Sequence, residues 1–190
     1  MLYIFDMGGV VTSTSNEIGK ISKIIGCTEE DFFKWCGSGQ GLLSMLSDGE
    51  ISVKDFWKIF SARSGIAVKT DWWHWLFHPV LNQGTVKIIR KLREAGNRVV
   101  CGTNTMDSHY QNHLERGEYA FFDQTYASNF MGVSKPSPDF WKIILTAEGV
   151  EPKDAVFIDD KKENVEGAKS LGIKSFLFES AEKLAEDLGI

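Results

Sequence analysis

The sequence predicts an α/β fold: a parallel sheet with helices on both faces, and a small helical insert after the first strand. Three observations predict it. From residue 82 onwards, short apolar segments alternate with amphipathic helical segments, as in a parallel sheet whose crossovers are helices. The preceding segment, 13–79, has helical periodicity and no convincing strand. The chain itself opens with an apolar strand that runs directly into a glycine-rich turn.

The opening strand and the insert can each be recognised from their spacing. Leu2-Tyr3-Ile4-Phe5 is apolar throughout and is followed by Asp6-Met7-Gly8-Gly9. Breaks at Gly37-Ser38-Gly39 and Asp48-Gly49 divide the insert, for which four or five short helices are expected. The apolar positions that carry the helical periodicity are Ile18, Ile21, Ile24, Ile25, Phe32, Phe33, Trp35, Phe56, Ile59 and Phe60.

The rest of the chain alternates between helix and strand. Helices are expected over residues 85–95, 138–148 and 162–171. Gly96 and Gly172 end the first and the third, and Ser137-Pro138 offers a hydroxyl cap and a proline for the start of the second. Strands are expected over residues 98–102, 124–127, 155–158 and 174–177.

Composition and charge exclude several classes of partner. The 190 residues suffice for one well-cored domain with a small insert. A net charge of −5 gives no reason to expect nucleic acid or an anionic membrane as partner. No apolar run reaches the roughly 18 residues of a membrane span, and no signal segment is evident. Cys27, Cys36 and Cys101 lack metal-type spacing, so a reducing cytoplasm is expected. The sequence does not indicate an oligomeric state.

Polar residues follow the apolar runs at four places. Asp6, Thr103-Asn104 and Asp159-Asp160 each come at the carboxyl end of an expected strand, and Lys135 lies in a loop that can join them. Ligands of such sheets bind beyond these strand ends. Two adjacent aspartates repel each other unless a cation lies between them, so the pair is hard to explain as a folding device. The alternative is that Asp159-Asp160 only caps the following helix.

These residue types fit phosphoryl transfer, which needs an attacking oxygen and neutralised phosphoryl oxygens. Asp6 is the expected nucleophile and would form an aspartyl-phosphate that water hydrolyses. Thr103 and the backbone amide of Asn104 would donate hydrogen bonds to the phosphoryl oxygens. Lys135 would supply positive charge, and Pro136 favours an extended backbone that projects it into the cleft.

A metal ion that holds the geometry completes this chemistry, and oxygen ligands of this kind predict Mg²⁺. Asp6, Asp160 and the backbone carbonyl near Gly8 are the expected ligands, with water completing the octahedron. Asp159 is expected to act through water or through Lys135. The expected partner is a small phosphorylated metabolite.

Together the four clusters resemble the haloacid dehalogenase-like superfamily of hydrolases. In family order, its motifs match Phe5-Asp6-Met7-Gly8-Gly9-Val10-Val11, Val100-Cys101-Gly102-Thr103-Asn104, Gly132-Val133-Ser134-Lys135-Pro136 and Phe157-Ile158-Asp159-Asp160, with Asn164 and Gly167-Ala168 following. The resemblance implies a Rossmann-like core formed by residues 1–12 and 80–190, and a helical cap formed by residues 13–79. It also implies that Lys135 orients Asp6 and Asp159.

One position departs from the family pattern. Most phosphatases of the family carry a second aspartate two residues after the nucleophile, as general acid and base, and here that residue is Gly8. Such assistance is typically worth about 10²–10⁴-fold in rate. Two explanations compete. In the first, the enzyme acts on leaving groups that need little protonation, or another group or water serves as the acid and base. In the second, the chain has become a phosphate-binding or regulatory protein. A branch with the same Asp-x-Gly opening and a Gly-Glu-Ile-Ser stretch, here Gly49-Glu50-Ile51-Ser52, includes a glucose 1-phosphate phosphatase and favours catalysis by analogy.

Dehalogenation is a third interpretation, in which Asp6 attacks carbon instead of phosphorus. That chemistry has no use for a metal ion, and family members that perform it generally lack a pair such as Asp159-Asp160. The aspartate pair therefore argues against it.

Three further features are open to two interpretations. The aromatic cluster 72–77, with Trp72 to Trp75, is expected to pack the cap against the core, although it could line a pocket or a dimer surface. His109 and His113 have the spacing of a metal pair but no third ligand, so they are expected on a polar helix surface near the cleft. Ser38-Gly39-Gln40 and Thr12-Ser13-Thr14 either contact the leaving group or are ordinary loops.

Overall fold

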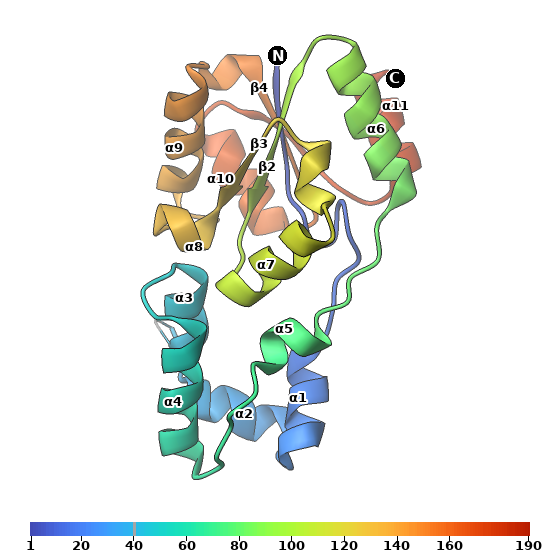
Figure 1. Ribbon diagram of the computed structural model, residues 1–190. Coiled ribbons are helices and arrows are strands. Elements are labelled where there is room, and N and C mark those ends of the chain that lie inside the picture. Colours follow the sequence, from blue (N-terminus) through green and yellow to red (C-terminus); the bar gives the residue numbers. More distant parts are fainter. Residues whose placement is uncertain (40) are drawn as a thin grey trace.

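A parallel sheet forms the centre of the computed structural model, which describes residues 1–39 and 41–190 (Figure 1). The strands of this part of the chain are β1 Leu2–Phe5, β2 Arg98–Thr103, β3 Gln124–Ala127, β4 Ala155–Asp159 and β5 Lys174–Leu177, in the spatial order β3-β2-β1-β4-β5. Neighbouring strands are all parallel, and Phe5 of the central strand is in register with Cys101 and Ile158. The predicted α/β class with a Rossmann-like parallel sheet is confirmed.

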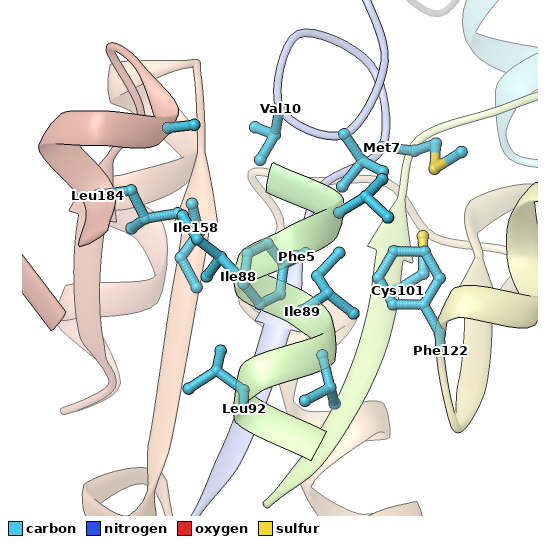
Figure 2. Close-up of a cluster of buried hydrophobic side chains, with 14 of the residues drawn as sticks. Phe5, Met7, Val10, Ile88, Ile89, Leu92, Cys101, Phe122, Ile158 and Leu184 are labelled. Carbon is cyan, nitrogen blue, oxygen red and sulfur yellow. The ribbon is translucent and has the colours of Figure 1, made fainter. Parts of the chain in front are cut away.

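Helices cover both faces of the sheet, as the alternation predicts. The helices α6 Gln83–Glu94 and α11 Ala181–Leu188 pack on one face, and α9 Pro138–Glu148 and α10 Lys162–Ser170 on the other. Figure 2 shows the first of these layers, where strand and helix side chains interlock: Phe5, Cys101, Ile158, Ile88, Ile89, Leu92 and Leu184. Fully burying side chains of this size contributes about 1.5–3 kcal/mol each. The two layers therefore fix the strand ends and the loops that follow them.

Helices α1 to α5 lie together outside the sheet (Figure 1). Their bounds are α1 Glu17–Ile25, α2 Glu29–Cys36, α3 Leu42–Ser47, α4 Val53–Ser64 and α5 Trp72–Leu76. They share a hydrophobic core of their own, in which the rings of Trp57 and Trp73 stack with centroids 5.6 Å apart. We call this group of helices the helical unit. The described residues of the insert thus contain five short helices, at the upper end of the expected number.

Side-chain caps start most helices of the helical unit. In each case a polar side chain accepts a hydrogen bond from a backbone N–H two or three residues further on, which satisfies a donor that has no partner within the helix. These capping residues are Asn16, Thr28, Ser52 and Asp71. The start of each of these helices is therefore determined by a capping residue directly before it, even where the helix is short.

Besides the packing of α5 on α7 Asp107–Glu115, where Ser108 Oγ donates to Asp71 Oδ2 at 2.6 Å, the helical unit meets the core at two places. Two linkers join it to the sheet and pair with each other, since the N–H of Ser13 donates to the carbonyl of Val80 at 2.8 Å and Val80 N–H donates to Ser13 Oγ at 3.0 Å. At the other place, α3 approaches α8 Ser128–Met131 (Figure 1). There Ser128 Oγ donates to the carbonyl of Ser47 at 2.6 Å.

Some local expectations differ from the structure. The sequence analysis did not identify α7 Asp107–Glu115, α8 or α11 as separate elements, nor the short 3₁₀ turns Glu118–Phe121 and Pro152–Asp154. Helix α6 begins earlier than expected because Asn82 Oδ1 accepts from the backbone N–H groups of its first turn. Ser137 stands at the start of α9, but its hydroxyl makes no capping bond. Within the described ranges, no helix combines the length and apolar character needed to cross a membrane.

The aromatic cluster 72–77 is divided between different environments. Trp73 is buried in the core of the helical unit, whereas Trp75 is 65% exposed. Phe77 leaves the unit and stacks on His109 of α7, with ring centroids 3.8 Å apart. The expected packing of cap against core therefore applies to Phe77, and Trp73 makes an edge contact with His109.

Candidate active site

Asp6 lies directly beyond β1, where its backbone is held by the neighbouring strand. Its N–H donates to the carbonyl of Ile158 at 2.9 Å, and its Oδ1 accepts from the N–H of Met7 at 2.8 Å. The residue is only 7% exposed. A carboxylate held in this way has a fixed position at the carboxyl ends of the strands, as a nucleophile requires.

Lys135 brings two of the predicted carboxylates together. Its Nζ lies 2.9 Å from Oδ1 of Asp6 and 2.7 Å from Oδ2 of Asp159. It also donates to the carbonyl of Gly102 at 2.9 Å, so all three of its N–H donors have acceptors. A buried ammonium is tolerated only when it is paired in this way.

Asn104 has a structural task that the sequence analysis missed. Its Nδ2 donates to the carbonyl of Lys135 at 2.8 Å, and its Oδ1 accepts from the N–H of Lys135 at 2.8 Å. The side chain thus holds the backbone of the lysine loop at two points, while the backbone of Asn104 remains beside the cavity described below. Asn104 could be identified in the sequence because it follows Thr103 in the second motif. Nothing in the sequence indicated that its side chain would bind the backbone of Lys135.

The two adjacent aspartates differ in their surroundings. Asp159 is fully buried, and its oxygens accept from Lys135, from the N–H of Lys161 at 2.8 Å and from Asn164 Nδ2 at 3.0 Å. Asp160 is half-buried, and its Oδ1 is buried without a hydrogen-bond partner among the described residues. Neither carboxylate caps α10, whose first helical residue follows Lys161, so the capping interpretation is wrong.

Gly9 allows Asp160 to approach the turn after β1. Gly9 has a φ of +83°, and a Cβ at this position would lie 2.2 Å from Oδ2 of Asp160. Any side chain here would therefore be strained and would displace the carboxylate. The second glycine of the opening motif is explained by this contact.

The three aspartates form a candidate site for a divalent cation. Asp6, Asp159 and Asp160 each offer one carboxylate oxygen, and these oxygens lie within 4.8 Å of one another. The buried Oδ1 of Asp160 needs a cation or a water molecule to satisfy it. Carboxylate oxygens are the ligands that Mg²⁺ and other hard cations prefer, so the donor set fits such an ion.

Burial is the main cause of the pKa shifts of the carboxyl groups in this cluster. Burial, only partly opposed by Lys135, raises the pKa of Asp6 to about 6. Burial and the neighbouring Asp159 also raise the pKa of Asp160. For Lys135, burial disfavours the charged form, but Asp6 and Asp159 outweigh it and raise the pKa. These directions are those expected for buried carboxyl groups around a buried ammonium that is paired with two of them.

A cavity of about 320 Å³ opens onto these groups. At one end, which we call the phosphate end, it is lined by Asp6, Gly8, Thr103, Asn104, Lys135 and Asp160. The other lining residues come from the two linkers, from α1 and from α7, and we call this part of the cavity the leaving-group end: Thr12, Ser13, Thr14, Ser15, Glu17, Phe77, His109 and His113. Thr12 forms a bridge with Gly8, so the two parts of the cavity meet there. The volume is at the low end of the range of about 300–1,000 Å³ for ligand pockets. All the predicted site residues except the fully buried Asp159 line it.

The leaving-group end contains residues that the sequence analysis did not place there. Glu17 was not singled out, because an acidic residue in the first turn of a helix is unremarkable in a sequence. His109 and His113 were expected on a polar helix surface near the cleft. They do lie on a helix, α7, and line the cavity, but the expected polar surface is wrong. His113 is 4% exposed and hydrogen-bonds the buried Glu118, and His109 is covered by Phe77.

Two loops had been considered as possible contacts of the leaving group, and the structure places only one of them at the cavity. Thr12-Ser13-Thr14 lines the cavity. Ser38 and Gly39 do not line it, and Gln40 lies outside the described residues. A larger cavity of about 600 Å³ lies at the opposite edge of the sheet, beside the Arg98–Glu148 ion pair, and none of the predicted site residues lines it.

Gly8 has room for a side chain. A Cβ at this position would meet no atom within 4 Å, and its φ is not in the left-handed region. The fold therefore does not force a glycine here, in contrast to Gly9. The missing carboxylate at residue 8 is a property of the sequence and not a steric requirement.

Comparisons with known proteins agree with this architecture. A family model for haloacid dehalogenase-like hydrolases matches residues 1–172. A HAD family enzyme from Bacteroides thetaiotaomicron, solved in complex with magnesium and inorganic phosphate, is 25% identical with a TM-score of 0.77 and covers 94% of each chain.

Two curated relatives match over shorter segments. Flavin mononucleotide hydrolase 1 of Arabidopsis thaliana, a chloroplast protein by name, is 41% identical over 69 residues, which are 36% of this chain and 28% of that protein. Glyceraldehyde 3-phosphate phosphatase of Pyrococcus abyssi is 32% identical over 97 residues, which are 50% of this chain and 41% of that protein. The chain thus matches less than half the length of these relatives. Since the family model covers most of the chain, and its motifs stand at the strand ends where the resemblance put them, this protein belongs to the haloacid dehalogenase-like hydrolases.

Proposed function

We propose that this protein is a Mg²⁺-dependent phosphatase that hydrolyses a small phosphate monoester through an aspartyl-phosphate intermediate. One observation carries the proposal: Lys135 joins Asp6 to Asp159, beside an Asp160 oxygen that has no partner in the described structure. A folding device would satisfy these charges internally. A site that receives a cation has a buried acceptor oxygen, such as Oδ1 of Asp160, that the protein itself does not satisfy.

Asp6 is the nucleophile of the proposed reaction. One of its carboxylate oxygens attacks phosphorus, the bond from phosphorus to the ester oxygen breaks, and the alcohol leaves with a proton taken from water or from a neighbouring group. Water then attacks phosphorus, releases inorganic phosphate and restores the carboxylate. Lys135, Thr103 and the backbone N–H of Asn104 stabilise the negative charge on the phosphoryl oxygens in both steps.

Two carboxylates and one carbonyl would hold the metal ion directly. Asp160 and Asp6 would bind it through side-chain oxygens, the carbonyl of Gly8 would contribute a backbone oxygen, and Asp159 would act through water or through Lys135. The bound Mg²⁺ would supply positive charge against the phosphoryl oxygens. The raised pKa values of Asp6 and Asp160 support this assignment, because a bound cation would favour the charged carboxylates that burial and Asp159 disfavour.

Residues 13–79 would act as a cap over the cleft, and residues 1–12 and 80–190 as the catalytic core. The separate hydrophobic core of the helical unit and the paired linkers support this division. The cap would limit the size of the leaving group. Relatives are named for flavin mononucleotide and glyceraldehyde 3-phosphate, and the cavity of about 320 Å³ favours the smaller kind of substrate.

The test is phosphate release from glucose 1-phosphate, glucose 6-phosphate and p-nitrophenyl phosphate, with and without Mg²⁺. Asp6→Asn is the matched control, because it keeps the shape of the side chain and removes the nucleophile. Metal-dependent release that falls at least about 10⁴-fold in the variant is expected. Activity retained by the variant would remove Asp6 from the mechanism. Tight binding of inorganic phosphate without release from any ester would favour a phosphate-binding protein instead.

A further inference from the structure

The leaving-group end of the cavity contains a buried carboxylate that the proposed chemistry does not use. Glu17, in the first turn of α1, is 7% exposed and lines the cavity together with the phosphate-binding groups. Its Oε1 accepts a hydrogen bond from the hydroxyl of Ser15. No Lys, Arg or His nitrogen within the described part of the chain lies within 4.0 Å of it.

Helix formation explains the position of Glu17 but not its burial. An acidic side chain in the first turn stabilises a helix by about 0.3–1 kcal/mol when it is exposed to solvent. Buried acids are almost always paired, because the loss of hydration costs more than this gain. Burial accordingly raises the pKa of Glu17. In α2, Glu30 occupies the same kind of position and is exposed.

The imidazole of His109 lines the same cavity. Its Nε2 is buried and has no hydrogen bond in the described structure, and its ring lies parallel to that of Phe77 at 3.8 Å. Burial, together with His113 and His74, lowers the pKa of His109 to about 3. The imidazole is therefore neutral near pH 7, with one N–H donor and one acceptor. Its stacking on Phe77 holds it in one orientation.

We infer that Glu17 and His109 form a subsite that selects phosphate esters whose leaving group carries hydroxyl groups. The carboxylate accepts hydrogen bonds from these hydroxyls, and the neutral imidazole offers one further donor or acceptor. The inference rests on the proposed function and names the substrate class of that site. A leaving group without hydroxyls would leave both groups buried and unpaired, and a negatively charged one would be repelled by Glu17.

Hydroxyl groups fit this end of the cavity better than an ammonium group. The neighbouring side chains are the hydroxyls of Thr12 to Ser15, which both donate and accept hydrogen bonds. An ammonium can only donate, and Glu17 is the single carboxylate among the described residues that line this end. The subsite thus has the mixed character that a polyol or sugar requires.

The experiment compares kcat/KM for ribose 5-phosphate, phenyl phosphate and phosphoethanolamine in four proteins: wild type, Glu17→Leu, His109→Phe and the control Glu30→Leu. Wild type is expected to prefer ribose 5-phosphate. Glu17→Leu should lower kcat/KM for this ester about 10- to 100-fold, mainly through KM, and leave phenyl phosphate within about threefold. His109→Phe, which keeps the stacking on Phe77, should show the same pattern to a smaller extent, and Glu30→Leu should change neither ester.

Binding separates failure of this inference from failure of the proposed function. Calorimetry with ribose 5-phosphate on Asp6→Asn, and on Asp6→Asn combined with Glu17→Leu, measures the subsite without turnover. A loss of affinity of about tenfold or more supports the subsite even if no ester is hydrolysed. Equal affinities of the two Asp6→Asn proteins for ribose 5-phosphate would overturn the inference. So would equal losses of kcat/KM for all three esters in Glu17→Leu, or a wild-type preference for phosphoethanolamine. Hydrolysis of phenyl phosphate would still establish the phosphatase in each case.

Discussion

The two ends of the active-site cavity are built in opposite ways. At the phosphate end, Lys135 is paired with two carboxylates and a carbonyl, and its backbone is held by Asn104. At the leaving-group end, Glu17 and His109 are buried with few or no partners. The first end is organised by the protein alone, apart from one oxygen of Asp160.

This difference separates the chemistry from the choice of substrate. Groups that stabilise a developing charge act best when they are already in place, because reorganisation would cost free energy in the transition state. Groups that select a substrate gain most when only the correct ligand satisfies them. The core supplies the first set from its strand ends, and the linkers, α1 and α7 supply the second. Predictions for the two ends therefore differ in kind.

The largest expected effect concerns the acid that the phosphate end lacks. Gly8→Asp should raise kcat for esters with poor leaving groups, such as glucose 6-phosphate, by up to about 10²–10⁴-fold. The open space around Gly8 means that the side chain can be accommodated. The hydrolysis of p-nitrophenyl phosphate, whose leaving group needs no proton, should change little. Equal effects on both esters in steady-state kinetics would show that proton transfer is not what limits the wild-type protein.

The second largest effect is expected on stability, when the cation of the phosphate end is removed. Lys135→Ala would leave Asp6 and Asp159 buried without their cation, and should lower the free energy of unfolding by about 3–5 kcal/mol at pH 7. Urea unfolding measures this loss, and added Mg²⁺ should restore part of it. Lys161→Ala is the matched control, since Lys161 lines the same cavity but is exposed. Equal stabilities of the two variants would contradict the central place of Lys135.

The raised pKa of Asp6 predicts a pH-dependent stability. Its folded-state pKa of about 6 exceeds the ordinary value of 3.8, so between these pH values the folded protein holds a proton that the unfolded chain has lost. Wild-type stability should therefore fall as pH rises through this window, by about 3 kcal/mol from this residue. Asp6→Asn cannot ionise and should gain stability relative to wild type from pH 4 to pH 7 in metal-free buffer. A difference that does not change with pH in thermal or urea unfolding would refute this prediction.

The contrast between the two ends also explains what the sequence could reveal. The strands at 124–127 and 174–177 were predicted with the bounds that the structure has, from their place in the alternation of helix and strand. Asp6, Thr103, Lys135 and the aspartate pair were identified because each follows or joins such a strand. Glu17 was not identified, and His109 was expected near the cleft but not buried, because both positions in the cavity depend on how the helical unit packs against α7. The spacing of residues along the chain does not indicate how the helical unit packs against α7.

The smallest expected effect tests how far the organisation of the phosphate end depends on one side chain. Asn104→Ala removes both hydrogen bonds to the backbone of Lys135, each worth about 0.5–1.5 kcal/mol, and should lower kcat about tenfold. Because Asn104 is exposed, the free energy of unfolding should change less than in Lys135→Ala. Asn104→Asp keeps an acceptor for the N–H of Lys135 but loses the donor to its carbonyl, so its kcat should fall between those of Asn104→Ala and wild type. If Asn104→Ala instead weakens only ester binding and leaves kcat unchanged, Asn104 contacts the substrate rather than positioning Lys135.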